Sequence, residues 1–240
     1  MLEEKMKKGK LYLSFRDFGD GKMDHIFSSR QGWSREDIFR DLAEVLEVDQ
    51  EKIYRGTQVH GDTIVLVGDE GPEAFRDRGF DGLITNRRGL ALVTYHADCT
   101  PLYFYDSRKA VIGMAHSGWR GSLLNIGGKM VERFTREFGS RPEDIEVAIG
   151  PAICGSCYQV QEDVYSQFMK EYRPEEILSE REGQVYLDLA RVNRINLLRA
   201  GIGPGNIHES NFCTACNIDK LYSYRLEHGR GRMIGSIILR

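Results

Sequence analysis

Three short segments in the middle of the chain constrain its fold more than any other feature. Residues 90–95, 102–105 and 111–115 are predominantly apolar and lie only a few positions apart. Such segments are typical of strands buried on both faces, because a half-exposed strand alternates apolar with polar residues. The sheet that these strands form must therefore be covered by further layers.

Helical and strand patterns surround this central region. Ser34 is a suitable N-cap for a helix over residues 34–48, whose apolar side chains recur with helical spacing. Further helices are predicted over residues 123–138, 160–172 and 187–200, and further strands over residues 63–67, 147–149 and 233–239. Helices and strands mix without a strict βαβ alternation, which predicts an α/β or α+β layered sandwich with a mixed sheet.

The composition favours one globular unit. Apolar residues make up 41% and charged residues 29% of the 240 positions, and no linker or internal repeat divides them. We expect residues 1–240 to form a single domain, in which the lysine-rich residues 1–10 are a loose tail.

The charge and the apolar runs limit the partners. A formal net charge of -3 argues against nucleic acid or an acidic membrane surface. No apolar run approaches the roughly 20 residues of a membrane span, and residues 1–10 lack the apolar stretch of a signal peptide. We therefore expect a cytoplasmic protein whose five cysteines are reduced thiols, used for metal binding or catalysis.

Four of the cysteines form two pairs with Cys-x-x-Cys spacing, Cys154 with Cys157 and Cys213 with Cys216. Two such pairs can bind zinc together in a four-thiolate site. The stretch between Cys157 and Cys213 is longer than such sites usually have, which favours separate structural thiols near a pocket.

Polar residues that a core does not need gather at three strand ends. These segments are Gln58-Val59-His60-Gly61, His96-Ala97-Asp98-Cys99 and His116-Ser117-Gly118-Trp119-Arg120-Gly121. Loops at strand ends are where a rigid scaffold presents reactive groups. A lone histidine is more often a hydrogen-bonded structural residue, and a lone cysteine a small buried hydrophobe. The residues by themselves therefore leave open whether His60, Cys99 and His116 form a metal site.

The order of these segments resembles that of a known family, the laccase-like multicopper polyphenol oxidoreductases, now regarded as purine nucleoside phosphorylases. The matching segments follow the family's order along nearly the whole chain and begin at His25, Gln58, Asp81, Ala97, His116, Gly150, Cys157, Asp188, Cys213 and Ser223. The resemblance implies a layered α/β fold and a zinc ion bound by His60, Cys99 and His116. It also implies one catalytic domain that phosphorolyses adenosine, inosine, guanosine and methylthioadenosine and deaminates adenosine.

These ligands suit a catalytic metal. Two imidazoles and one thiolate leave one position of a tetrahedral zinc ion open, and zinc lowers the pKa of bound water to about 7, which suits deamination. Asp98, next to the Cys99 ligand, is a candidate proton shuttle or an anchor of the site, with a turn-forming aspartate as the alternative.

Phosphorolysis requires a phosphate ion placed against the anomeric carbon of a nucleoside. The arginine fork binds two phosphate oxygens at once, which makes Arg30, Arg120 and Arg225 candidate ligands, although each also fits an ordinary surface position. The beginning of the helix near Gly121 offers a further place for an anion. Tyr158 or Trp119 can stack on a purine or serve as packing residues.

Three other interpretations fit the same residues. A Cys/His hydrolase would use Cys99 as nucleophile and His116 as base, without a metal. A copper oxidoreductase would bind copper through these residues and Met114, although a multicopper enzyme needs more imidazoles than six histidines supply. A metal-stabilised module without turnover, connected with the cell wall, is the non-enzymatic alternative.

Overall fold

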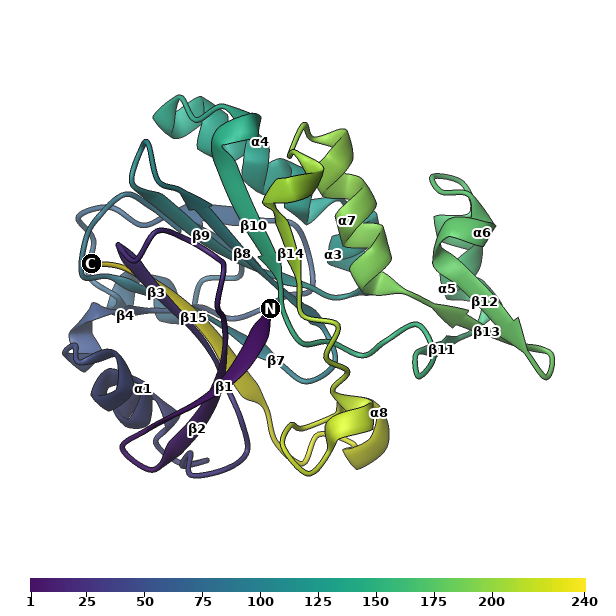
Figure 1. The fold of residues 1–240 in the computed structure, drawn as a ribbon, viewed down its shortest axis with the longest axis horizontal. Coiled ribbons are helices and arrows are strands. Elements are labelled where there is room, and N and C mark those ends of the chain that lie inside the picture. The colour runs from purple at the N-terminus through teal and green to yellow at the C-terminus, as the bar shows by residue number, and fades with distance from the viewer.

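The computed structural model describes residues 1–240, in which two six-stranded sheets pack face to face (Figure 1). The first sheet has the order β1-β2-β3-β15-β7-β4, formed by Leu2–Lys7, Lys10–Phe15, Met23–Ser28, Met233–Leu239, Ala91–His96 and Ile53–Tyr54. The second has the order β14-β10-β8-β9-β6-β5, formed by Ile207–Glu209, Ile145–Ile149, Thr100–Asp106, Val111–Ser117, Gly82–Thr85 and Ile64–Leu66. Both sheets contain parallel and antiparallel pairs, as the sequence predicted.

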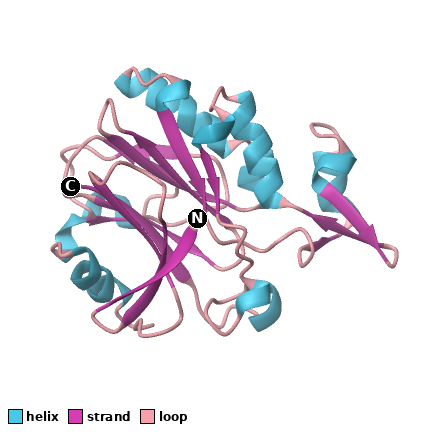
Figure 2. Cartoon of the chain, in the orientation of Figure 1, coloured by secondary structure: helices cyan, strands magenta, loops and turns pink.

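Helices cover the outer faces of both sheets (Figure 2). Helices α4 (Ile126–Phe138) and α7 (Leu189–Arg199) bury their apolar side chains against the second sheet, where Phe134 contacts Phe104. Helix α1 (Ile38–Leu46) covers the first sheet with Leu42 and Val45. The predicted α/β layered sandwich is therefore confirmed, with the layer order helix, sheet, sheet, helix.

The two sheets share a dry core that holds their relative position. Leu92 and Ile237 of the first sheet pack in one cluster with Tyr103 and Met114 of the second. Gly235 permits the close approach, since a Cβ atom there would lie 2.4 Å from Cε of Met114. Full burial of each such side chain contributes roughly 1.5–3 kcal/mol. Strand β7 of the first sheet is thus fixed against the neighbouring strands β8 and β9 of the second, and the site described below lies at the ends of these strands.

Residues 1–10 are ordered, contrary to the loose tail that the sequence led us to expect. Strands β1 and β2 pair along their whole length, with Leu2 opposite Phe15. Lys8 and Gly9 form the turn with φ angles of 50° and 76°, the left-handed conformations that a two-residue hairpin needs. The lysine side chains do not oppose pairing, because those of Lys5 and Lys8 lie exposed to solvent.

Two of the predicted helices begin later than expected, because a residue further along the chain caps each of them. Helix α1 begins after Asp37, whose carboxylate accepts the N–H of Arg40, whereas Ser34 accepts the N–H groups of Glu36 and Asp37 in a preceding turn. The helix predicted over residues 123–138 begins only at Ile126 as α4, because Asn125 is left-handed and caps it, and the separate short helix α3 (Trp119–Leu123) precedes it. Gly121 therefore lies inside a short helix and does not open a long one.

A small lobe projects from the body of the sandwich beyond α7 (Figure 1). It consists of residues 159–187 and contains a three-stranded sheet of the order β11-β13-β12, formed by Gln159–Val160, Gln184–Leu187 and Leu178–Arg181. Helices α5 (Glu162–Phe168) and α6 (Pro174–Ile177) pack on it, so only part of the helix predicted over residues 160–172 forms. Short helices α2 (Glu73–Arg76) and α8 (Tyr224–Glu227) complete the fold, and no helix has the length and apolar character to cross a membrane.

Candidate active site

His60 lies in a loop before β5 that a buried carboxylate organises. Asp81, which directly precedes β6, accepts the backbone N–H groups of Val59, His60 and Gly61 at 3.2, 3.1 and 2.7 Å. These bonds hold His60 in a left-handed backbone conformation with φ 58°. Such a conformation is costly for a residue other than glycine and persists where surrounding contacts enforce it, often at functional sites. The loop is therefore shaped to present the His60 imidazole.

The loop between β7 and β8 presents Cys99 in a comparable way. Asp98 has φ 84°, and its carboxylate accepts hydrogen bonds from Thr214 Oγ1 at 2.6 Å, Ser223 Oγ at 3.1 Å and the Arg225 backbone N–H at 2.7 Å. Three donors thus occupy the Asp98 oxygens. This geometry favours the anchoring role for Asp98 over a proton shuttle, since the carboxylate ties the Cys99 loop to the C-terminal segments.

His116 lies near the end of β9 with only 2% of its surface exposed. Its Nδ1 atom lies 2.8 Å from Asp81 Oδ1, and its ring meets that of His60 edge-on at 4.8 Å between centroids. Gly118 keeps the space between these groups open, because a Cβ atom there would lie 3.1 Å from Cys99 Sγ and 3.4 Å from His60 Cδ2.

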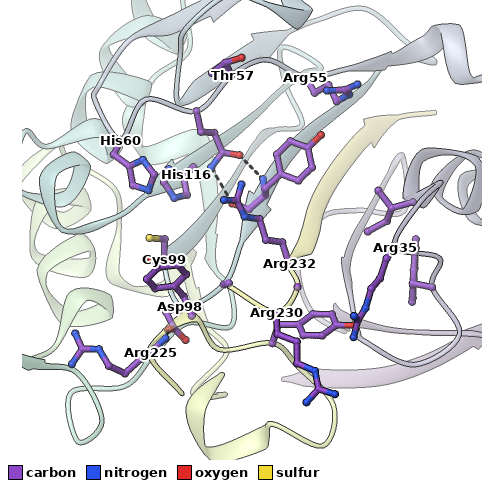
Figure 3. A pocket seen from close by; sticks show the side chains of 18 of the residues that line it. Arg35, Arg55, Thr57, His60, Asp98, Cys99, His116, Arg225, Arg230 and Arg232 are labelled. Carbon is purple, nitrogen blue, oxygen red and sulfur yellow. Dashed lines mark hydrogen bonds between the residues drawn. The ribbon is translucent and has the colours of Figure 1, made fainter. Parts of the chain in front are cut away.

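The three groups converge on one point, as Figure 3 shows for His60, His116 and Cys99. One donor atom from each lies within 4.8 Å of the other two. Two imidazole nitrogens and a thiolate sulfur at this spacing suit a tetrahedral zinc ion with its fourth position free. The carboxylate of Asp81 behind His116 is the kind of outer partner that orients metal-ligating histidines. The residues therefore fit the metal that the sequence suggested.

The protonation of these groups supports the same conclusion. Burial disfavours the Cys99 thiolate, but hydrogen bonds from His116 and His60 outweigh it and lower the pKa of Cys99 to about 6. Burial likewise disfavours the His116 imidazolium, but Asp81 and Cys99 outweigh it and raise the pKa of His116 to about 9. The chain thus stabilises the Cys99 thiolate beside the positively charged His116. A metal cation can replace the protons on these two residues, because metal binding releases protons from its ligands.

His60, Cys99 and His116 line a cavity of about 1110 Å³ whose charge is strongly positive. Asp98 is the one acidic residue in its wall, and its oxygens already bind other groups. The wall also contains six arginines, namely Arg35, Arg55, Arg120, Arg225, Arg230 and Arg232. Aromatic side chains complete it: Trp33, Tyr95, Trp119, Tyr158, Tyr222 and Tyr224. A cavity of this kind suits an anionic ligand together with a flat ring.

The three arginines selected from the sequence have different surroundings. Arg120 lines the cavity with its guanidinium stacked on Trp119 at 4.3 Å, and Arg225 lines it while donating to the Gln159 carbonyl at 2.8 Å. Arg30 does not line the cavity, because its guanidinium pairs with Glu227 at 3.0 Å and donates to the Ile218 carbonyl. Both of the aromatic residues chosen as stacking candidates, Trp119 and Tyr158, do line it.

Sequence reasoning missed Asp81 and four of the arginines. Asp81 carries a visible signal, because a fully buried aspartate at the beginning of the apolar strand Gly82–Thr85 needs a partner. Arg230 and Arg232 directly precede β15 and resemble ordinary surface residues in sequence. Arg35 and Arg55 come from the region of α1 and from the loop after β4, and only the tertiary fold brings them to the cavity.

Comparisons with known proteins show which family the chain resembles. A family model described as multi-copper polyphenol oxidoreductase laccase matches residues 36–240. The purine nucleoside phosphorylase YlmD of Geobacillus stearothermophilus is 39% identical over 208 residues, which cover 82% of this chain and 76% of that protein. The adenosine deaminase RL5 of an unknown prokaryotic organism is 30% identical over 195 residues, or 77% of this chain and 73% of that protein.

The fold has a close counterpart among solved structures. The crystal structure of YlmD from Geobacillus stearothermophilus superposes with a TM-score of 0.88 at 32% identity and covers 98% of both chains. The arrangement of two sheets and their covering helices therefore extends over the entire chain, including the projecting lobe.

Proposed function

The chain belongs to the multi-copper polyphenol oxidoreductase laccase family, and we propose that it is a zinc-dependent purine nucleoside phosphorylase that also deaminates adenosine. The observation that carries the proposal is the convergence of His60, Cys99 and His116 in the wall of an arginine-lined cavity. Relatives named purine nucleoside phosphorylase and adenosine deaminase support it. We further propose that residues 1–240 act as one catalytic domain in the cytoplasm.

The residues of this chain would divide the work as follows. His60, Cys99 and His116 hold the metal, and Asp81 fixes the tautomer of His116 by accepting its Nδ1–H. When bound, zinc supplies a Lewis acid that stabilises negative charge developing on a neighbouring substrate atom. Asp98 positions Cys99 by fastening its loop to Thr214 and Ser223.

The arginines would bind phosphate for the first reaction. In phosphorolysis a phosphate oxygen forms a bond to the anomeric carbon, the bond to the purine nitrogen breaks, and the purine leaves with a proton. Arg120 and Arg225 are the proposed phosphate ligands, since both line the cavity near aromatic side chains. Tyr158 and Trp119 would stack on the purine. Adenosine, inosine, guanosine and methylthioadenosine are the proposed substrates.

The second reaction needs no phosphate. In deamination the oxygen of a water molecule forms a bond to the purine carbon that carries the amino group, and ammonia leaves. The same cavity serves both reactions if the purine and ribose can lie in two positions relative to His60 and His116, and a volume of about 1110 Å³ provides that room.

A Cys/His hydrolase is the second candidate, because one observation favours it. The lowered pKa of Cys99, about 6, together with the raised pKa of His116 describes a thiolate–imidazolium pair of the kind that cysteine nucleophiles use. A multicopper oxidase lacks comparable support, since the two potential metal clusters contain only two histidines between them and Met114 packs in the core between the sheets.

One assay separates these functions. Purified protein is incubated with adenosine in the presence and absence of phosphate, and the products are identified. Adenine and ribose 1-phosphate would appear only with phosphate. Ammonia would appear in both conditions, together with inosine or, when phosphate is present, its phosphorolysis product hypoxanthine. Absence of both reactions from zinc-loaded protein would overturn the proposal, and activity that survives chelation but not thiol alkylation would favour the hydrolase.

A further inference from the structure

A second cluster of side chains that could bind a metal ion lies outside the cavity wall. The sulfur atoms of Cys154, Cys157, Cys213 and Cys216 all lie within 4.8 Å of one another, and those of Cys157 and Cys216 are 3.5 Å apart. All four are free thiols. The sequence favoured separate structural thiols because of the long stretch between the two pairs, but the fold closes that distance.

Backbone pairing brings the two Cys-x-x-Cys segments together. Ala152 and Cys213 form a parallel bridge, with the Ala152 N–H donating to Phe212 and the Thr214 N–H donating to Ala152. Within the first segment, the N–H groups of Cys157 and Tyr158 both donate to the Cys154 carbonyl at 2.9 and 3.0 Å, which makes a tight turn. The arrangement of the four sulfurs thus follows from ordered main chain.

One further hydrogen bond reaches a sulfur atom directly. The backbone N–H of Cys154 points at Cys213 Sγ at 3.3 Å. This bond fixes the Cys213 sulfur against the Cys154 turn. The guanidinium of Arg181 also donates to the Ser156 carbonyl in the first turn, which brings a positive charge near the cluster.

We propose that Cys154, Cys157, Cys213 and Cys216 bind a structural zinc ion. Zinc–sulfur bonds of about 2.3 Å in a tetrahedron place the sulfurs about 3.8 Å apart, close to the spacing found here. Soft thiolates in Cys-x-x-Cys pairs are the ligands that zinc prefers in closed sites. Four protein ligands leave no open position, so this ion holds the fold and takes no part in chemistry.

The position of the cluster gives the ion a defined task. Cys157 directly precedes Tyr158 and the projecting lobe of residues 159–187, while Cys213 directly precedes Thr214, which donates to Asp98. A zinc ion would therefore fasten the base of the lobe to the segment that anchors the Cys99 loop. Loss of the ion should loosen both Tyr158 in the cavity wall and the Asp98 anchor.

Zinc content of the whole protein, purified under reducing conditions, tests the proposal. We expect wild type to contain two zinc ions per chain, and both Cys99→Ser and the double variant Cys157→Ser/Cys216→Ser to contain one. Ser156→Ala, in the same turn but without a proposed ligand role, should retain two. The double variant should also show faster proteolysis in the lobe. This test is independent of the proposed function. If His60, Cys99 and His116 bound no zinc, wild type would still contain the one zinc ion that the double variant loses.

A spectroscopic measurement on wild type keeps the test valid if the double variant does not fold. Cobalt(II) exchanged into the protein should give the intense thiolate-to-metal absorption of a four-sulfur site, and the same absorption should persist in Cys99→Ser. Unchanged zinc in the double variant, iron in place of zinc, or disulfides among these four cysteines in reduced wild type would overturn the proposal.

Discussion

The Nδ1 atom of His116 and Oδ1 of Asp81 lie 2.8 Å apart in the core, with 2% and 0% of the two residues exposed. The same carboxylate accepts three backbone N–H groups of the His60 loop. One aspartate therefore positions two of the three proposed metal ligands, although it does not itself line the cavity.

Replacing this carboxylate should weaken metal binding. Asp81→Asn keeps an oxygen acceptor but removes the negative charge that fixes the His116 tautomer, and loss of such outer partners typically costs about 10- to 100-fold in metal affinity. Zinc affinity measured by competition with a chelator checks this. Asp106→Asn alters another fully buried aspartate, at the opposite end of β8, and should leave zinc affinity unchanged. An equal effect of both variants would mean that only general stability is involved.

Cys99 distinguishes a metal ligand from a nucleophile. Cys99→Ser replaces a soft charged ligand with a poor neutral one, so zinc content and adenosine turnover should fall together, whereas Cys99→His should retain part of both. Chelation of wild type should abolish turnover, and added zinc should restore it. A chelator-resistant enzyme that thiol alkylation inactivates would contradict the metal assignment.

Arg120 should contribute more to phosphorolysis, which uses phosphate, than to deamination, which uses water. Arg120→Ala should raise the KM for phosphate about tenfold to a hundredfold, because a charge-assisted hydrogen bond contributes about 1.5–3 kcal/mol. Deamination, which needs no anion, should change much less. Arg30→Ala is the matched control, since Arg30 pairs with Glu227 and does not itself line the cavity, so its loss should leave the KM for phosphate unchanged. Equal losses in both reactions of Arg120→Ala would indicate a positioning role.

Acid should destabilise the protein through His25, which does not line the cavity. Burial, with a smaller contribution from Lys5, lowers the pKa of His25 to about 4, and its Nε2 accepts the Phe15 N–H at 2.8 Å. As the pH falls, His25 therefore becomes protonated near pH 6.5 in the unfolded chain but only near pH 4 in the folded chain. Stability is full above pH 6.5 and falls as the pH drops through this window, by up to about 3 kcal/mol.

Denaturant unfolding at several pH values checks this prediction. His25→Gln keeps a hydrogen-bond acceptor for Phe15 but has no titrating group, so its unfolding free energy should fall less between pH 7 and pH 4.5 than that of wild type. Identical pH dependence of the two proteins would show that other groups cause the acid sensitivity.

The sequence alone determined the layers of the fold and the segments that carry polar residues at strand ends, while the proposed zinc ligands followed from the family resemblance. Strands β7, β8 and β9 were predictable because burial on both faces demands continuous apolar segments, and each chemistry-bearing residue stood where such a segment begins or ends. His60, Cys99 and His116 were therefore recognisable before their distances were known. Local patterns were less decisive at helix ends: Asp37 caps α1 in place of the expected Ser34, and Asn125 moves the beginning of α4 to Ile126.

Only the tertiary structure decided which residues act together. The role of Asp81, the difference between Arg30 and Arg232, and the closure of the two cysteine pairs all depend on contacts between segments far apart in the chain. Sequence spacing carries no information about such contacts, because a guanidinium or a thiol has the same intrinsic chemistry on any surface. Its task is set by the charges, donors and empty space that packing places within a few ångströms.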